Sequence, residues 1–111
     1  MKLVVNVYGE RRHFVIPRDA RKTMRLSKGD YVMYRVLEIN DKPAKIDFLQ
    51  SPPIIGKAMV AGMTSMAMSM YPTFKELLGI KPGDRLLIDV IAVIKKYKGK
   101  HKVIWIDDAN N

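Results

Sequence analysis

The most constraining feature of this 111-residue sequence is an internal repeat at an offset of 54 residues. At this offset Gly29-Asp30 falls on Gly83-Asp84 without a gap, and the apolar-rich stretch 31–39 falls on 85–93. A glycine and a carboxylate directly before an extended run are typical of a tight turn that leads into a strand. The repeat therefore predicts two copies of one small supersecondary unit.

Each copy reads as two strands, a short helix and two further strands. In the first half, runs rich in β-branched and aromatic residues predict strands at 3–8, 12–16, 31–39 and 44–49. Pro17 stops the second strand and presets the backbone for a helix. The apolar side of that helix consists of Ala20, Met24 and Leu26.

The second half predicts the same order of elements with different residues. Its strands are expected at 57–61, 66–70, 85–95 and 102–106. Thr73 and Glu76 have the spacing of a capping box, which predicts that Thr73 caps the second helix. Gly79 suits the end of that helix, and the stretch 81–84 suits a type II turn.

Pro52 and Pro53 separate the two copies, because neither proline can donate a hydrogen bond to a sheet. We therefore divide the chain into repeat 1 (1–50), a proline-rich linker (51–56) and repeat 2 (57–111). Neither repeat is large enough to cover both faces of its own thin sheet. The sequence thus predicts a mostly β (α+β) protein in which two ββαββ repeats interleave into one barrel with a shared core.

Two groups of residues are assigned to structure. Asp30 and Asp84 each follow a turn glycine, so we interpret them as carboxylates that bind their own turn, not as a catalytic pair. The second group is a methionine cluster, which could form an adaptable binding surface. Its alternation favours a place in the core. The cluster consists of Met59, Met63, Met66, Met68 and Met70.

The charge of the chain indicates a polyanionic partner. Twenty Lys and Arg against eleven Asp and Glu give a formal net charge of +9, shared by both halves. This favours nucleic acid ahead of anionic lipid, with a merely soluble lysine-rich protein as the alternative. The longest apolar window, 58–70, is too short to cross a bilayer. We therefore expect a cytoplasmic, nucleoid-associated protein without a membrane partner.

Cations concentrate in 11–28, which holds seven Lys and Arg but one acid. Arginine can grip a phosphate or a guanine with two hydrogen bonds. The predicted DNA contacts are Arg11, Arg12, His13, Arg18, Arg21, Lys22, Arg25 and Lys28. The secondary candidates are Lys95, Lys96, Lys98, Lys100 and Lys102. The alternatives are a solvated helix face for the first group and, for the second, lysines that discourage edge-to-edge aggregation.

Other chemistry is scarce in the sequence. The two histidines, His13 and His101, lack acids at metal-ligand spacing, and without cysteine there is neither a disulfide nor a thiolate metal site. Glycine-rich phosphate loops and serine nucleophile motifs are also absent from the sequence. We therefore expect a protein that is not an enzyme and needs no metal or cofactor.

The segment 14–30, FVIPRDARKTMRLSKGD, resembles the signature of the AbrB, MazE and SpoVT swapped-hairpin family. In that family a ββαββ protomer of about fifty residues exchanges hairpins with a second one to form a DNA-binding dimer. The chain resembles two such protomers fused head to tail. The resemblance implies a single swapped-hairpin barrel, a double-stranded DNA partner and a role in transcription regulation.

The resemblance also implies that the two repeats differ in function. The family's DNA-facing basic positions are occupied in repeat 1 by His13, preceded by Arg11 and Arg12, and by Arg21 and Lys22. In repeat 2 the corresponding residues are Ala67, Lys75 and Glu76, while Tyr71 replaces the proline, which follows one place later as Pro72. Repeat 2 is thus expected to be a structural partner.

Two other functions stay open from the sequence. The Met-rich half could capture another protein, as in an antitoxin, although only 107–111 would follow the last strand. Barrels with Gly-Asp turns also include small-ligand binders, which a deep pocket between the repeats would favour. Whether the pseudo-two-fold chain forms a homodimer is likewise open.

Overall fold

The computed structural model of the chain describes residues 1–46, 49–60 and 66–106. The first half contains β1 (Lys2–Tyr8), β2 (His13–Val15), α1 (Arg18–Thr23), β3 (Tyr31–Ile39), β4 (Lys42–Pro43), β5 (Lys45–Ile46) and β6 (Leu49–Gln50). The second contains β7 (Ile54–Val60), β8 (Met66–Met68), α2 (Pro72–Leu78), β9 (Arg85–Tyr97) and β10 (Lys100–Trp105). Among the described residues, no helix is long and apolar enough to span a membrane.

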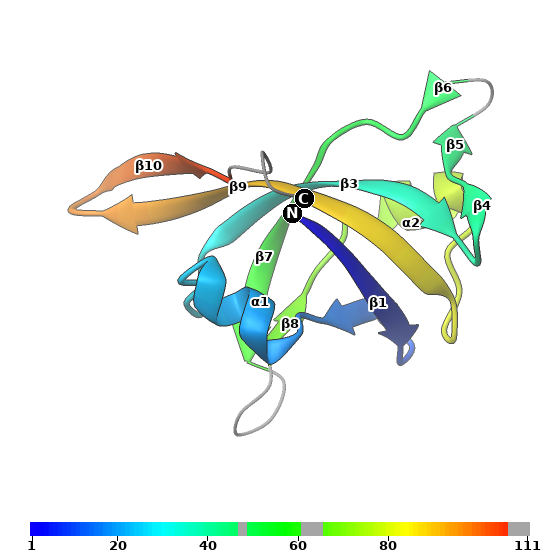
Figure 1. The fold of residues 1–111 in the computed structure, drawn as a ribbon, viewed down its shortest axis with the longest axis horizontal. Coiled ribbons are helices and arrows are strands. Elements are labelled where there is room, and N and C mark those ends of the chain that lie inside the picture. Colours follow the sequence, from blue (N-terminus) through cyan, green and yellow to red (C-terminus); the bar gives the residue numbers. More distant parts are fainter. Residues whose placement is uncertain (47–48, 61–65, 107–111) are drawn as a thin grey trace.

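Six strands form a closed barrel in the order β9-β1-β2-β8-β7-β3, which the pairing of β3 with β9 completes (Figure 1). The two halves alternate around this barrel. β1 pairs with β9 of the second half, β7 pairs with β3 of the first half, and β2 pairs with β8. The predicted mostly β barrel of interleaved repeats is therefore confirmed.

The register of the barrel follows the repeat in the sequence. Arg35 is opposite Asp89, and Phe14 is opposite Met68, so both pairs join residues that are 54 positions apart. The Gly-Asp turns also join the two halves, because each turn docks on the first strand of the other half. The Gly29 N–H donates to the Ala58 carbonyl at 2.9 Å, and the Gly83 N–H donates to the Val7 carbonyl at 2.8 Å.

The turn carboxylates close their own turns, as predicted. Asp30 Oδ2 accepts a hydrogen bond from the Ser27 N–H at 2.8 Å, and Asp84 Oδ2 accepts one from the Lys81 N–H at 2.8 Å. Gly29 and Gly83 have φ of 89° and 91°, a conformation that glycine adopts without the steric cost of a Cβ. These contacts fix the points at which β3 and β9 begin.

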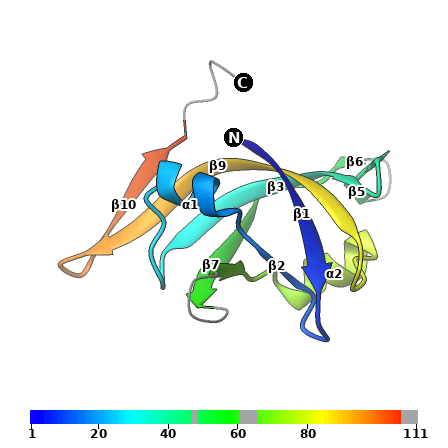
Figure 2. The same cartoon turned by 60° about the horizontal axis from the view of Figure 1, so that its bottom comes forward.

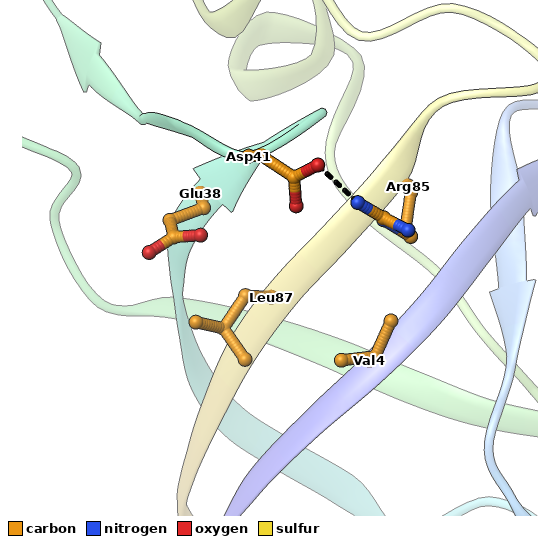
Figure 3. Close-up of a pocket in the computed structure, with 5 residues that line it drawn as sticks. All are labelled: Val4, Glu38, Asp41, Arg85 and Leu87. Carbon is orange, nitrogen blue, oxygen red and sulfur yellow. Dashed lines mark hydrogen bonds and ion pairs between the residues drawn. The ribbon is translucent and has the colours of Figure 1, made fainter.

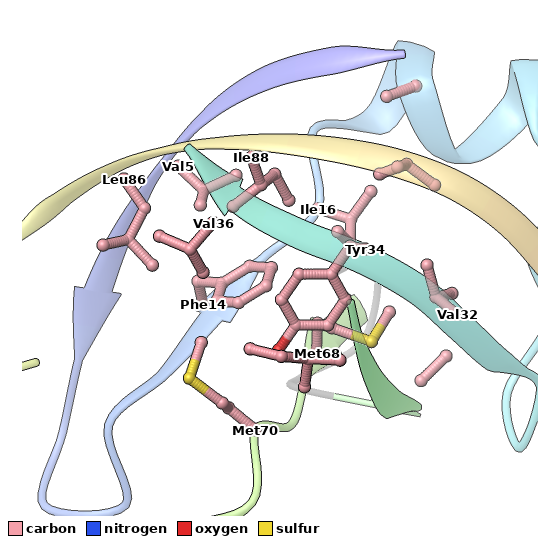
Figure 4. Close-up of a cluster of buried hydrophobic side chains, with 14 of the residues drawn as sticks. Val5, Phe14, Ile16, Val32, Tyr34, Val36, Met68, Met70, Leu86 and Ile88 are labelled. Carbon is pink, nitrogen blue, oxygen red and sulfur yellow. The ribbon is translucent and has the colours of Figure 1, made fainter. Parts of the chain in front are cut away.

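The barrel interior is filled by large side chains from both halves (Figure 4). Phe14 and Tyr34 meet edge to face, with ring centroids 5.6 Å apart, and Met68 is fully buried beside Tyr34. Met66 and Met70 are buried as well, which confirms the core placement of the alternating methionines. Met63 lies outside the described residues.

Tyr34→Phe is expected to lower the free energy of unfolding by about 1–2 kcal/mol, because a partly buried carbonyl loses its hydrogen-bond donor. The Tyr34 hydroxyl donates to the Ser69 carbonyl at 3.0 Å, and burial raises the pKa of Tyr34, so the hydroxyl stays protonated. Urea unfolding measures the effect, and Tyr97→Phe at an exposed ring is the control. Equal stability of both variants would contradict this role for the hydroxyl.

Several predicted boundaries are wrong. The capping box does not form: α2 begins at Pro72, Tyr71 is its N-cap residue, and the cap has no side-chain hydrogen bond. Proline at the first helical position needs no N–H partner, so the helix starts one residue before Thr73. Gly79 ends α2 in the left-handed conformation, as predicted.

The ends of the strands also differ from the predictions. β7 starts at Ile54, inside the predicted linker 51–56, because it pairs with β3 from Tyr34 onward. Within the strand predicted at 44–49, Lys45–Ile46 forms β5 and Leu49 begins β6, and these short strands pair with each other, while 47–48 lie outside the described residues. β4 precedes this stretch and pairs with the end of β3, after a turn in which Asn40 and Asp41 both have positive φ. β9 continues to Tyr97, past its predicted end at 95. Its partner β10 begins at Lys100, before its predicted start at 102.

Candidate nucleic-acid interface

Helix α1 presents cations because its apolar side is used for packing. Ala20, Met24 and Leu26 are all buried, as predicted from their spacing. Arg18 and Lys22 are exposed, while Arg21 is half-buried and has an interaction of its own. Arg25, which follows the helix, is exposed. The helix therefore turns a basic side away from the core.

The hairpin of β9 and β10 is the second basic element. The first part of β9 pairs with β1, and its last part, from Ala92 to Tyr97, pairs with β10 (Figure 1). All six residues of β10 are exposed, so the hairpin projects from the barrel. Lys98 and Gly99 form its turn with positive φ, and the Lys98 ammonium lies 5.4 Å from the Tyr97 ring centroid.

Lys95 joins the hairpin to the residues that follow α1. Its ammonium donates to Asp30 Oδ2 at 2.7 Å and to the Arg25 carbonyl at 2.7 Å. Lys102 is directly opposite Lys95 in the hairpin, and Lys100 is two residues away on the same face. The face that carries these lysines is thus the one directed toward α1.

We name this region the α1–hairpin surface. It comprises Arg18, Arg21, Lys22, Arg25 and Lys28 from the first half and Lys95, Lys98, Lys100 and Lys102 from the second half. Lys96 follows Lys95 directly in β9, so it lies on the opposite face of the hairpin. Figure 2 shows α1 beside β10. The two segments that form the surface, 18–30 and 95–102, contain ten Lys and Arg but two acids. Lys95 is engaged within the protein and Arg21 has an interaction of its own, so the exposed cations of the surface are the ones that a ligand can contact.

Arg11, Arg12 and His13 do not join this surface. They lie at the opposite end of β2, next to α2, and the β1–β2 turn is distant from α1 in both views of the ribbon. Arg12 binds Glu76 at 2.6 Å and the Ile80 carbonyl at 3.2 Å, so its guanidinium is engaged within the protein. The predicted DNA contacts of repeat 1 are therefore divided between two ends of the barrel.

His13 and Lys75 share this second location. The His13 ring meets Tyr8 edge to face at 4.5 Å, and the buried Lys75 ammonium donates to the Arg11 carbonyl. Burial lowers the pKa of His13, and the nearby Lys75 and Arg11 lower it further. Burial also lowers the pKa of Lys75, with a further contribution from Arg12. This arrangement ties the β1–β2 turn to α2.

The pseudo-equivalent end of the barrel has no comparable charge excess. The segments that correspond to the α1–hairpin surface, 72–84 and 41–48, contain four Lys and four acids. Asp41 is at the position equivalent to Lys95, and it pairs with the Arg85 guanidinium beside a shallow hollow lined also by Val4, Glu38 and Leu87 (Figure 3). The two halves therefore have similar backbone structure, but their equivalent segments differ in net charge.

Comparisons with known proteins give information about the fold of the chain. No protein-family model matches the chain, and no curated protein matches it. A solved structure shares the fold. It is the solution structure of PHS018 from Pyrococcus horikoshii, with a TM-score of 0.59 and 20% sequence identity. The match covers 87% of this chain and 95% of that one. At this identity the likeness concerns the fold alone.

Sequence reasoning missed the roles of three residues. Lys75 and Lys95 are structural cations, which is visible only once their carbonyl and carboxylate acceptors are in place. Trp105 is 67% exposed, although the strand pattern gave no reason to single it out. A large aromatic residue at the end of a lysine-rich strand is the signal that could have identified it.

Proposed function

We propose that the protein binds double-stranded DNA through the α1–hairpin surface and acts as a transcription regulator. The observation that supports this most strongly is the unequal charge of two equivalent ends. The segments 18–30 and 95–102 hold ten cations and two acids, whereas the equivalent segments 72–84 and 41–48 hold four of each. Arg11 and Arg12 also lie beside α2, but the Arg12 guanidinium is engaged with Glu76 and the Ile80 carbonyl. A solvated surface needs no such inequality, whereas a polyanion needs a basic side.

The geometry of the cations suits phosphate binding. Short helices and projecting hairpins are the elements that follow a DNA backbone or enter a groove. The exposed arginines Arg18 and Arg25 lie on the helix side, and exposed lysines lie on the hairpin side. Two rows of cations from separate elements can contact phosphates at separate positions of a duplex. Arginine supplies bidentate contacts, and lysine supplies point charges.

The second half contributes few further contacts in this proposal. On α2, Lys75 and Glu76 occupy the places of Arg21 and Lys22. Lys75 is buried against the Arg11 carbonyl, and Glu76 is paired with Arg12. These contacts support the prediction that α2 stabilises the barrel while α1 binds the ligand.

The filled barrel gives less support to a small-ligand function. Phe14, Tyr34, Met68 and their neighbours occupy the space between the repeats. Hollows of about 290–380 Å³ lie among residues of the outer elements. A protein-capture function finds little support in the methionines, because Met66, Met68 and Met70 are core residues. Our proposal assigns no catalytic step.

Duplex DNA is expected to bind with a steep salt dependence. If about five phosphates are neutralised, the logarithm of the binding constant should fall with the logarithm of salt concentration at a slope of about −4.5. Fluorescence anisotropy of a labelled duplex over a series of potassium chloride concentrations measures this slope. Failure to bind at low salt, or a slope near zero, would refute the proposed function.

A further inference from the structure

A hollow of about 350 Å³ lies between the end of α1 and the end of β10. Its lining is mixed. Met24, Ile104, Trp105 and Ile106 contribute apolar side chains, and Met1, Thr23 and Arg25 complete it. Met24 is buried in the core beneath, whereas Trp105 is 67% exposed. The hollow therefore has a packed floor and an open indole on its wall.

One cationic side chain belongs to the lining of this hollow. Arg25 lines it, and the Arg25 carbonyl is held by Lys95 at 2.7 Å, which fixes the backbone at this point. Arg25 has φ of 52°, which is in the left-handed region that few residues other than glycine adopt. Lys100 and Lys102 lie on the face of β10 opposite to Trp105, because side chains alternate along a strand, so Arg25 is the cation nearest to the hollow. A ligand with a flat apolar part and an anionic part matches this combination.

The geometry points to a nucleobase site: the hollow receives one unpaired base, stacked on Trp105, while Arg25 holds the adjoining phosphate. Aromatic side chains within a basic groove are the means by which proteins bind unpaired bases without strict sequence preference. The inference rests on the proposed function and narrows it. The favoured target is then DNA with an unpaired or extruded base.

Two other occupants fit the observations less well. A second copy of the chain that used the β10 edge would bring Lys100 and Lys102 of both copies together, and like charges on adjacent strands repel. A membrane would favour exposed aromatic residues gathered at one place, whereas Tyr97 is at the projecting tip and Trp105 is at the other end of β10. Trp105 is at the barrel end of β10, inside a concavity, which suits a single ring.

Trp105 is the only tryptophan of the sequence, so its fluorescence reports on this hollow directly. The test titrates the full chain with three probes of matched charge: a single-stranded oligonucleotide, its fully paired duplex, and inorganic polyphosphate. Stacking predicts strong quenching by the single strand. It predicts weaker quenching by the duplex and little by polyphosphate, even where polyphosphate binds.

Variants complete the test with a labelled oligonucleotide. Trp105→Ala is expected to weaken single-strand binding about fivefold or more. Polyphosphate binding should be unchanged, and Trp105→Phe should restore part of the loss. Tyr97→Ala is the matched control, because Tyr97 is equally exposed but outside the hollow. Both variants can be checked for folding by their thermal transitions.

The outcomes separate this inference from the proposed function. Unchanged single-strand affinity of Trp105→Ala, or equal quenching by polyphosphate, would overturn the base site even if the duplex still binds. Quenching that rises with protein concentration alone, or that anionic vesicles cause more strongly than the oligonucleotide, would overturn it in favour of a second copy or a membrane. Loss of binding to every polyanion would refute the proposed function itself.

Discussion

Gly56→Ala is expected to lower the free energy of unfolding by about 3 kcal/mol, a large part of the stability of a domain of this size. An added Cβ would come closer than 3.0 Å to the Ser69 carbonyl oxygen and would also press on Met68 Sδ and Tyr34. The oxygen cannot retreat easily, because it accepts the Tyr34 hydroxyl bond and belongs to a backbone segment bound to Lys57. Equilibrium unfolding in urea measures the loss.

Gly9→Ala provides the control for this substitution. Gly9 has φ of 73° and open space around it, so alanine there costs about 1–2 kcal/mol through backbone strain alone. A crowding effect at Gly56 requires a clearly larger loss than at Gly9. If the two variants unfold at the same urea concentration, the close approach of β7 to Ser69 is not a constraint on the fold.

Reversing two charges on α1 is expected to weaken duplex binding about a hundredfold or more at moderate salt, because repulsion replaces two phosphate contacts. The variant is Arg18→Glu with Lys22→Glu, and both side chains are exposed. Their substitution should therefore leave the thermal transition nearly unchanged, as exposed positions usually do. Fluorescence anisotropy with a labelled duplex measures the affinity.

A second double variant, with the same net charge as the first, provides the control. Lys45→Glu with Lys81→Glu makes the same change in net charge, but both lysines are exposed in the segments 41–48 and 72–84. If position decides binding, this second variant should lose less than about fivefold in affinity. Equal losses would show that net charge alone attracts DNA, and the α1–hairpin surface would have no special role.

The parts of the fold that the sequence predicts well are those with a local cause. Gly29-Asp30 and Gly83-Asp84 close turns with their own side chains, so the start of β3 and β9 can be located from a few residues. The closed barrel was predicted because neither half is large enough to cover both faces of its own sheet. The start of α2 shows the opposite case, because the sequence there has both a proline and a capping-box spacing. The helix begins at Pro72, and Thr73 does not cap it.

The candidate site was harder to predict because its members meet only through tertiary structure. Lys95 reaches Asp30 across 65 positions of the sequence, and α1 meets the hairpin through that contact. Arg12 and Lys22 were both predicted from the sequence to contact DNA. In the structure Arg12 lies beside α2, where it binds Glu76, and Lys22 lies on α1. Composition indicated a basic surface, but its division between two ends of the barrel depends on the path of β2.

The exchange of strands between the halves has a consequence for synthesis of the protein. β1 and β3 both need β9 as a neighbour, and β9 ends at Tyr97. While the ribosome is still making the second half, the emerging first half has strand edges with nothing to pair with. We expect the strands of the first half to stay unpaired until β9 has been translated, and the barrel then to fold in one cooperative step.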